Sequence, residues 1–188
     1  MRHIIRVLLV LLLLTASLAW ADDYDDTIKV FKNAGQSGKF FQKAYGYAVF
    51  PTIGKGGIGI GGAHGKGRVY AHGKYVGDTS MTQITVGAQL GGEAYSQIIF
   101  FQNEDAFKEF TSGNFEFGAQ AQAVAITAGA SASAGTGGGA SASASGGKND
   151  AKTAGGYRKG MAVFTVAKGG LMYEASIGGQ KFSYKPKK

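Results

Sequence analysis

Hydrophobic and polar positions alternate over many short segments of the chain, and this pattern predicts a β-rich fold. Nine segments alternate or are rich in β-branched and aromatic residues, which is typical of strands with a buried face. They span residues 47–50, 57–62, 68–72, 83–90, 94–102, 115–130, 161–167, 171–177 and 181–184. Gly, Asn, Asp or Ser separates them. We therefore expect an α+β, β-rich domain with a largely antiparallel, barrel-like sheet.

Three segments instead show helical spacing. Tyr24, Ile28 and Phe31 recur at i, i+4 and i+7, a second short helix follows the N-cap Ser37, and a third starts at the N-cap Asn103. The pattern thus predicts two short N-terminal helices and one short internal helix. Their aromatic stripes are read as core packing, with a membrane-inserting face as the alternative.

Residues 1–21 have the layout of a secretory signal peptide. Arg2 and Arg6 precede an apolar run over residues 7–14, and Ala19-Trp20-Ala21 ends the segment. The alternative is an uncleaved anchor, but the run is short for a span of about 20 residues. We expect cleavage after Ala21, a single domain over residues 22–188, and a periplasmic or secreted location. The Gly/Ala/Ser tract at residues 135–147 predicts a flexible loop.

The residue types for catalysis and metal binding are scarce. The chain has no cysteine, which excludes disulfides, thiol nucleophiles, Cys-ligated metals and a lipid-modified cysteine. Only His64 and His72 remain after cleavage, and they lack metal-ligand spacing. Residues 57–62 satisfy G-x-G-x-x-G, but no helix follows to hold a pyrophosphate. We expect a protein that is not an enzyme and has no metal or cofactor.

Positive charge is the strongest functional signal. Cleavage removes two of the 20 basic residues and leaves 18 against 12 acidic ones, a net charge of +6. The sequences AVFPTIGKGGI (48–58) and AVFTVAKGGL (162–171) repeat with one extra residue in the first copy. In each, a Lys-Gly-Gly turn would offer backbone N–H groups and a cation to an anion. The alternatives are a plain hairpin and a solubilising surface.

Anionic phospholipid headgroups are the partner that this charge favours. Nucleic acid would use the same charges, but export argues against it. The predicted lipid-binding residues are Lys55, Gly56, Gly57, Lys66, Arg68, Lys74, Lys168, Gly169 and Gly170.

One long run resembles a known family. YGYAVFPTIGKGGIGIGGAHGKGRVY (45–70) is similar to the signature of the SYLF domain, also known from yeast actin-patch proteins. QITVGAQLG (83–91), IIFFQNEDAFKEF (98–110) and GLMYEASIGGQKF (170–182) resemble it further, so the likeness covers roughly residues 27–182. The resemblance implies a β-rich domain with a few helices that binds phospholipids, in eukaryotic members often phosphoinositides.

Two departures limit what the resemblance implies. Eukaryotic members can carry SH3 or FYVE modules, for which this chain has no segment. Some members bind membranes by an amphipathic helix before the domain, where this chain has the predicted signal peptide and the acidic residues 22–26. We therefore expect lipid binding as a class, without actin binding or phosphoinositide specificity.

The function expected from the sequence is non-catalytic binding of phospholipid or another amphiphile in a bacterial cell envelope or secretome. One alternative is a small outer-membrane β-barrel, since the alternating strands would suffice for about eight strands. Another is a structural or protein-interaction protein of the envelope, for which lipid binding is incidental.

Overall fold

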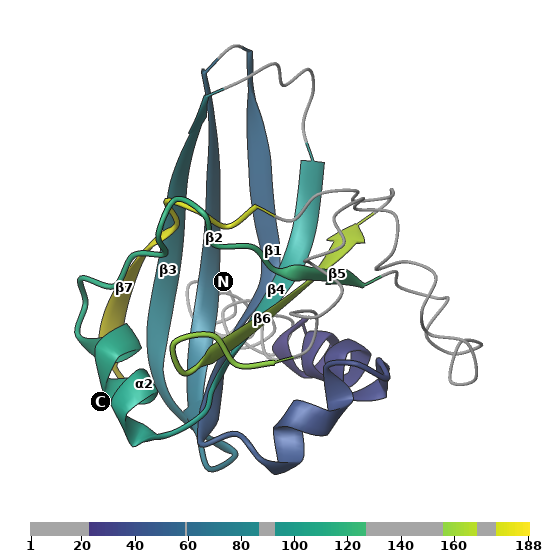
Figure 1. Ribbon diagram of the computed structural model, residues 1–188, viewed down its shortest axis with the longest axis vertical. Coiled ribbons are helices and arrows are strands. Elements are labelled where there is room, and N and C mark those ends of the chain that lie inside the picture. Colours follow the sequence, from purple (N-terminus) through teal and green to yellow (C-terminus); the bar gives the residue numbers. More distant parts are fainter. Residues whose placement is uncertain (1–22, 59, 87–92, 127–155, 169–175) are drawn as a thin grey trace, which may run out of the picture.

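Seven strands form one sheet in the computed structural model, which describes residues 23–58, 60–86, 93–126, 156–168 and 176–188 (Figure 1). The order across the sheet is β5-β6-β4-β1-β2-β3-β7. β5 and β6 pair in parallel and all other neighbours are antiparallel, so the sheet is mixed. The strands are β1 (Gly46–Ile58), β2 (Ile60–Ala71), β3 (Lys74–Val86), β4 (Glu93–Phe101), β5 (Val124–Ile126), β6 (Met161–Lys168) and β7 (Lys181–Pro186).

The barrel-like part of the prediction is wrong, because the sheet is not closed. β5 and β7 stand at its two ends and do not pair with each other. The strand predicted over residues 115–130 is reduced to Val124–Ile126, and residues 127–130 lie outside the described residues. Upstream of β5 the chain makes only isolated bridges, Glu116 with Lys181 and Gln122 with Ser176. This irregular segment runs beside residues 176–182 without completing a strand.

The glycine-rich region forms long strands, longer than the sequence indicated. β1 has 13 residues and β2 has 12. Glycine is a weak strand former, but here the missing side chains make room for the core: a Cβ on Gly65 or Gly67 would lie 2.6 Å from the side chain of Ile53 or Phe50, respectively. The segment Lys55–Gly57 therefore lies within β1 and is not a turn.

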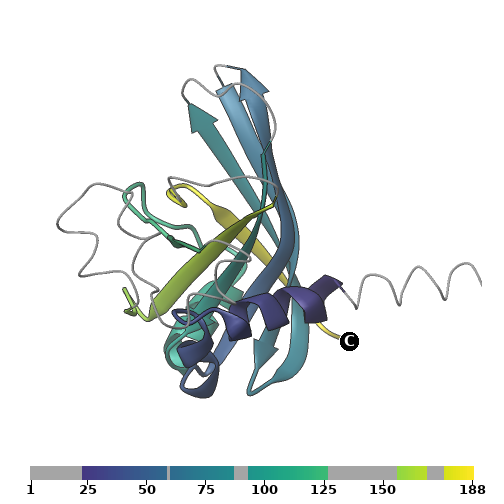
Figure 2. The same ribbon diagram turned by 90° about the vertical axis from the view of Figure 1, so that its right-hand side faces the viewer.

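Helices cover both faces of the lower part of the sheet. A helix over residues 23–33 and the 3-10 helix η1 (Gly38–Gln42) lie on one face. On the other face lies α2 (Glu104–Thr111), whose N-cap Asn103 accepts a hydrogen bond from the Ala106 N–H at 3.0 Å. In Figure 2 the N-terminal helix crosses the lower part of the sheet, and β1–β3 rise past it. No helix within the described ranges is long and apolar enough to cross a membrane.

Two hydrophobic clusters, one on each face, form the core. The cluster under the N-terminal helices is mostly aromatic, with Phe40 stacked on Phe100 at 5.3 Å between ring centroids. In the cluster under α2, Phe110 packs against Phe182 with 4.9 Å between the ring centroids. Both clusters lie in the lower and middle parts of the sheet, and no helix among the described residues covers the upper part of the face under the N-terminal helix.

Residues 1–21 and 135–147 lie outside the described residues. The predicted signal peptide and flexible loop therefore stay predictions, and so does most of the predicted strand at 171–177.

Candidate functional site

One face of the upper sheet presents polar and basic side chains to solvent. Along β2 the residues alternate strictly, with Ile60, Gly62, His64 and Lys66 exposed and the residues between them buried. The inward residues include Ala63, which belongs to the cluster under α2. The exposed residues therefore lie on the opposite face of the sheet, the one that the N-terminal helix covers lower down.

The strand register carries this face across six strands. Lys181 of β7 pairs with Thr82, Thr82 with His64, His64 with Gly54, Gly54 with Ala94, and Ala94 with Lys168 of β6. Five strand spacings of about 4.8 Å give this row a length of roughly 24 Å. Lys66 lies two residues after His64 in β2, and Lys185 lies four residues after Lys181 in β7. Both intervals are even, so these two lysines lie on the same face as the row. We name Lys66, Lys168, Lys181 and Lys185 the cationic face; all four side chains are exposed.

Hydroxyl groups lie between these lysines. The Lys168 ammonium donates to Thr52 Oγ1 at 2.7 Å, and Lys66 pairs in register with Thr52 on one side and Ser80 on the other. Ser80 Oγ lies 2.6 Å from Ser183 Oγ. Ammonium groups beside hydroxyls are hydrogen-bond donors that suit the oxygens of a phosphate.

Two carboxylates adjoin the cationic face. Glu116 lies 3.7 Å from the Lys181 ammonium in an exposed ion pair, which contributes little to stability in water. Asp78 accepts a 2.6 Å hydrogen bond from the Tyr75 hydroxyl and pairs in register with Lys185. Lower on the same face, the N-terminal helix adds Asp23 and Asp25, close to Tyr24 and Tyr70. Above this helix the four lysines outnumber Glu116 and Asp78, so the upper part of the face has a positive balance among the described residues.

Arg68 lies on this face of β2, but its charge is already engaged. The guanidinium carbon is 4.3 Å from the ring centroid of Tyr24 in the N-terminal helix and 4.8 Å from that of Tyr75 in β3. Burial raises the pKa of Tyr24 and of Tyr70, and the adjacent Arg68 partly opposes both shifts. Arg68 thus joins the N-terminal helix to the sheet.

Lys55 and Lys74 lie away from the cationic face. Lys55 pairs with Ala63, a residue of the cluster under α2, so it lies on the opposite face. Lys74 begins β3 at the turn after His72 and Gly73, at the far end of the β2–β3 hairpin from Ile60. Of the predicted basic residues, the structure therefore brings Lys66, Arg68 and Lys168 onto one face and places the other two elsewhere.

The two copies of the repeat are not equivalent in space. Both flank β4, but Phe50 pairs with Gln97 whereas Phe164 pairs with the neighbouring Ile98. Since successive residues of β4 point to opposite faces, Lys55 and Lys168 lie on opposite faces too. Gly56 and Gly57 lie within β1, and Gly169 and Gly170 lie outside the described residues. The Lys-Gly-Gly turn predicted for the first copy is therefore wrong, whereas the one predicted for the second copy lies largely outside the described residues.

Sequence reasoning missed Lys181 and Lys185. In β7 the polar residues Lys181, Ser183 and Lys185 are exposed and alternate with the buried Phe182 and the half-buried Tyr184. This alternation could have assigned both lysines to one face of a strand. It could not have shown that the strand lies beside β3.

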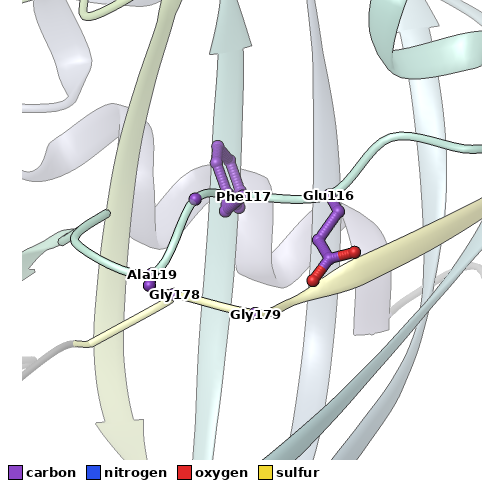
Figure 3. A pocket seen from close by; sticks show the side chains of 6 residues that line it. Glu116, Phe117, Ala119, Gly178 and Gly179 are labelled. Atoms are coloured by element: carbon purple, nitrogen blue, oxygen red, sulfur yellow. The ribbon is translucent and has the colours of Figure 1, made fainter.

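A shallow pocket lies elsewhere, between residues 116–119 and the turn at 178–179 (Figure 3). Its volume is about 440 Å³, and it is lined by Glu116, Phe117, Gly118, Ala119, Gly178 and Gly179. No predicted lysine lines it, and the Glu116 carboxylate would repel an anionic group. Within the described ranges, no group of three His, Cys, Asp or Glu residues is placed to hold a metal ion.

The exposed basic face of this β-rich scaffold is complementary in charge to an anionic surface or ligand. The family model Ysc84, described as Las17-binding protein actin regulator, matches residues 82–187, more than half of the chain. The chain therefore belongs to this family, the SYLF family that its sequence resembles. Membership supports a lipid-binding or related role in general.

A curated relative supports the same family. Beta cell expansion factor A from Aeromonas veronii is 28% identical over 157 residues, which cover 82% of this chain and 51% of the relative. The chain thus spans about half the length of the curated relative that it matches.

Proposed function

We propose that this protein binds anionic phospholipid at a bilayer surface, without chemical change to the lipid, and that the cationic face makes the contact. The observation that supports this most is the convergence of lysines from β2, β6 and β7 on one exposed face of the sheet. Residues far apart in the chain thereby form a single positive surface.

The electrostatics favour a membrane surface as partner. Each basic residue near an anionic bilayer contributes about 1 kcal/mol, so four lysines on one face supply a few kcal/mol at low salt. A row about 24 Å long is also broader than one headgroup. Surface binding fits this shape better than capture of one lipid in the pocket, where Glu116 opposes a phosphate. Lipid binding is extended to this chain from its family; actin regulation is not.

A pair of charge-swap variants tests the proposed face. Lys66→Glu with Lys168→Glu reverses two charges on the cationic face, and Lys55→Glu with Lys74→Glu makes the same change in net charge elsewhere. Sedimentation with phosphatidylglycerol vesicles in dilute buffer should fall on the order of tenfold for the first pair and less than about threefold for the second.

Comparing the two double variants separates the effect of the cationic face from the effect of net charge, because both variants change the net charge equally. Circular dichroism of both variants checks that they fold. An equal loss in the two pairs would show that net charge alone controls binding and would contradict the assigned face. No sedimentation of the unaltered protein with these vesicles, at any salt concentration, would contradict the proposed function.

A further inference from the structure

Two isoleucines stand exposed at the end of the face that carries the lysines. Ile60 is 71% exposed and Ile84 is 80% exposed. Among the residues whose side-chain exposure the structure describes, which do not include Ile58 and Val86, the one other exposed large hydrophobic side chain is Val30 at 39% on the N-terminal helix. Single exposed apolar residues are common on proteins, but two highly exposed neighbours at one end of a sheet are a distinct feature.

The register makes them neighbours. Gly62 pairs with Ile84, and Ile60 is two residues from Gly62 on the same face of β2. In the row of Ile84 the next positions across the sheet are Gly62 and Gly56, and a Cβ on Gly56 would meet nothing within 4 Å. In the next row Ile60 pairs in register with Val86 on one side and Ile58 on the other. The row of Ile84 therefore has no side chain at its next two positions, and the row of Ile60 consists of three apolar residues.

The lysines follow the isoleucines along the same face. From Ile60, His64 and Lys66 are four and six residues along β2, or about 13 and 20 Å. Apolar groups of proteins that lie on membranes reach about 5–10 Å into the headgroup and acyl boundary. With the strands inclined to the bilayer, the isoleucines can enter that boundary while the lysines remain at the headgroups.

Charge also argues against a second copy of this chain as the occupant. A two-fold interface places the same patch of both partners together. If the two faces lay over each other with their strands in the same direction, Lys66 and Lys168 would come close to the same lysines of the other copy. An anionic bilayer instead offers apolar chains to the isoleucines and negative charge to the lysines.

We propose that Ile60 and Ile84 form an insertion tip, which enters the acyl-chain boundary of the bilayer that the cationic face binds. This inference rests on the proposed function. It adds that binding has an apolar component that salt does not screen, and it assigns that component to two side chains.

The first test uses the absence of cysteine from the chain. Ile84→Cys and, as control, Lys74→Cys each give the full chain one thiol for an environment-sensitive fluorophore. With phosphatidylglycerol vesicles, the label at residue 84 should brighten, shift to the blue and be quenched by spin labels on the upper acyl chain. The label at residue 74 should do none of these. Vesicle binding without any change at residue 84 would overturn the insertion tip.

The second test removes the apolar groups without a label. Ile60→Ser with Ile84→Ser should lower vesicle affinity on the order of tenfold and abolish the binding that persists at high salt, whereas Val30→Ser should leave both unchanged. Since both isoleucines are largely exposed, the variant should fold normally.

The outcomes separate the two proposals. Unchanged affinity of the double serine variant would overturn the insertion tip and leave the proposed function intact. An unaltered protein that binds no vesicles would overturn both. Concentration-dependent dimers that vanish in the double serine variant would show that the tip serves self-association, which also overturns the inference.

Discussion

At the scale of single residues, two glycines of β2 are important because they have no side chain. Gly65 and Gly67 lie on the inward face, where the missing Cβ atoms let Ile53 and Phe50 pack directly on the backbone. Glycine enrichment in this region suggested close approach to an anion. The structure shows instead that these two glycines admit core side chains.

A matched pair of alanine substitutions tests this packing. In Gly67→Ala the new Cβ would lie 2.6 Å from the Phe50 ring and 2.8 Å from the Val49 carbonyl oxygen, so we expect a loss of about 1–3 kcal/mol. In Gly54→Ala nothing lies within 4 Å of the new Cβ, and stability should change by no more than about 0.5 kcal/mol. Urea unfolding measures both, and equal losses would contradict the packing role.

The environment of Tyr95 makes the stability of the protein depend on pH in the alkaline range. Its hydroxyl accepts a hydrogen bond from Gln180 Nε2 at 3.2 Å, and Gln180 exchanges two further hydrogen bonds with the buried Gln97. Burial raises the pKa of Tyr95 to about 12, from an ordinary value of 10.0. The folded protein therefore keeps this proton at a pH where the unfolded chain releases it.

The sign of the pH dependence follows from this difference. The stability linked to neutral Tyr95 is present below about pH 10 and is lost as the pH rises toward about 12. Tyr95→Phe should cost about 1 kcal/mol at neutral pH, through the lost hydrogen bond, and should flatten the alkaline decline. The measurement is the free energy of unfolding in urea from about pH 8 to about pH 11. If the free energy of unfolding fell equally with pH in the unaltered protein and in Tyr95→Phe, the raised pKa would not be the cause of the decline.

At the scale of elements, Arg68 connects the N-terminal helix to the sheet. Its guanidinium lies between the rings of Tyr24 and Tyr75, a contact that depends on a planar cation. The sequence marked Arg68 as a headgroup contact. Its place between two rings favours a role in holding the helix.

Substitution of Arg68 distinguishes the two roles. Arg68→Gln should lower stability by about 1–3 kcal/mol and make the helix over residues 23–33 more sensitive to protease, with Arg68→Lys in between. Vesicle affinity should fall by less than about fivefold, the share of one charge at most. A large loss of vesicle binding with unchanged protease resistance would instead make Arg68 a headgroup contact.

At the scale of the whole molecule, the order of the strands decides where the charges gather. Lys66, Lys168 and Lys181 are separated by up to 115 positions in the chain but lie in adjacent or nearby rows of one face. Lys55 and Lys168, which follow the same repeat, lie on opposite faces. Ile60 and Ile84 lie exposed at the end of the same face.

The sequence by itself determined the β-rich class and the family, and it marked part of most elements. Alternation with a period of two marked most strands, the Asn103 cap marked the start of α2, and the run over residues 45–70 indicated the family. These features are local, because capping and alternation depend on residues a few positions apart.

Only the tertiary structure decided which lysines share a face, that Arg68 is enclosed by tyrosines, and that the sheet stays open. Each depends on pairing between distant strands, where a slip of one residue moves a side chain to the other face. In β1 the register also shifts between Phe50 and Ile53, which absorbs the extra residue of the first repeat. Periodicity in one segment carries no information about its register against the next, so long-range packing had to supply it.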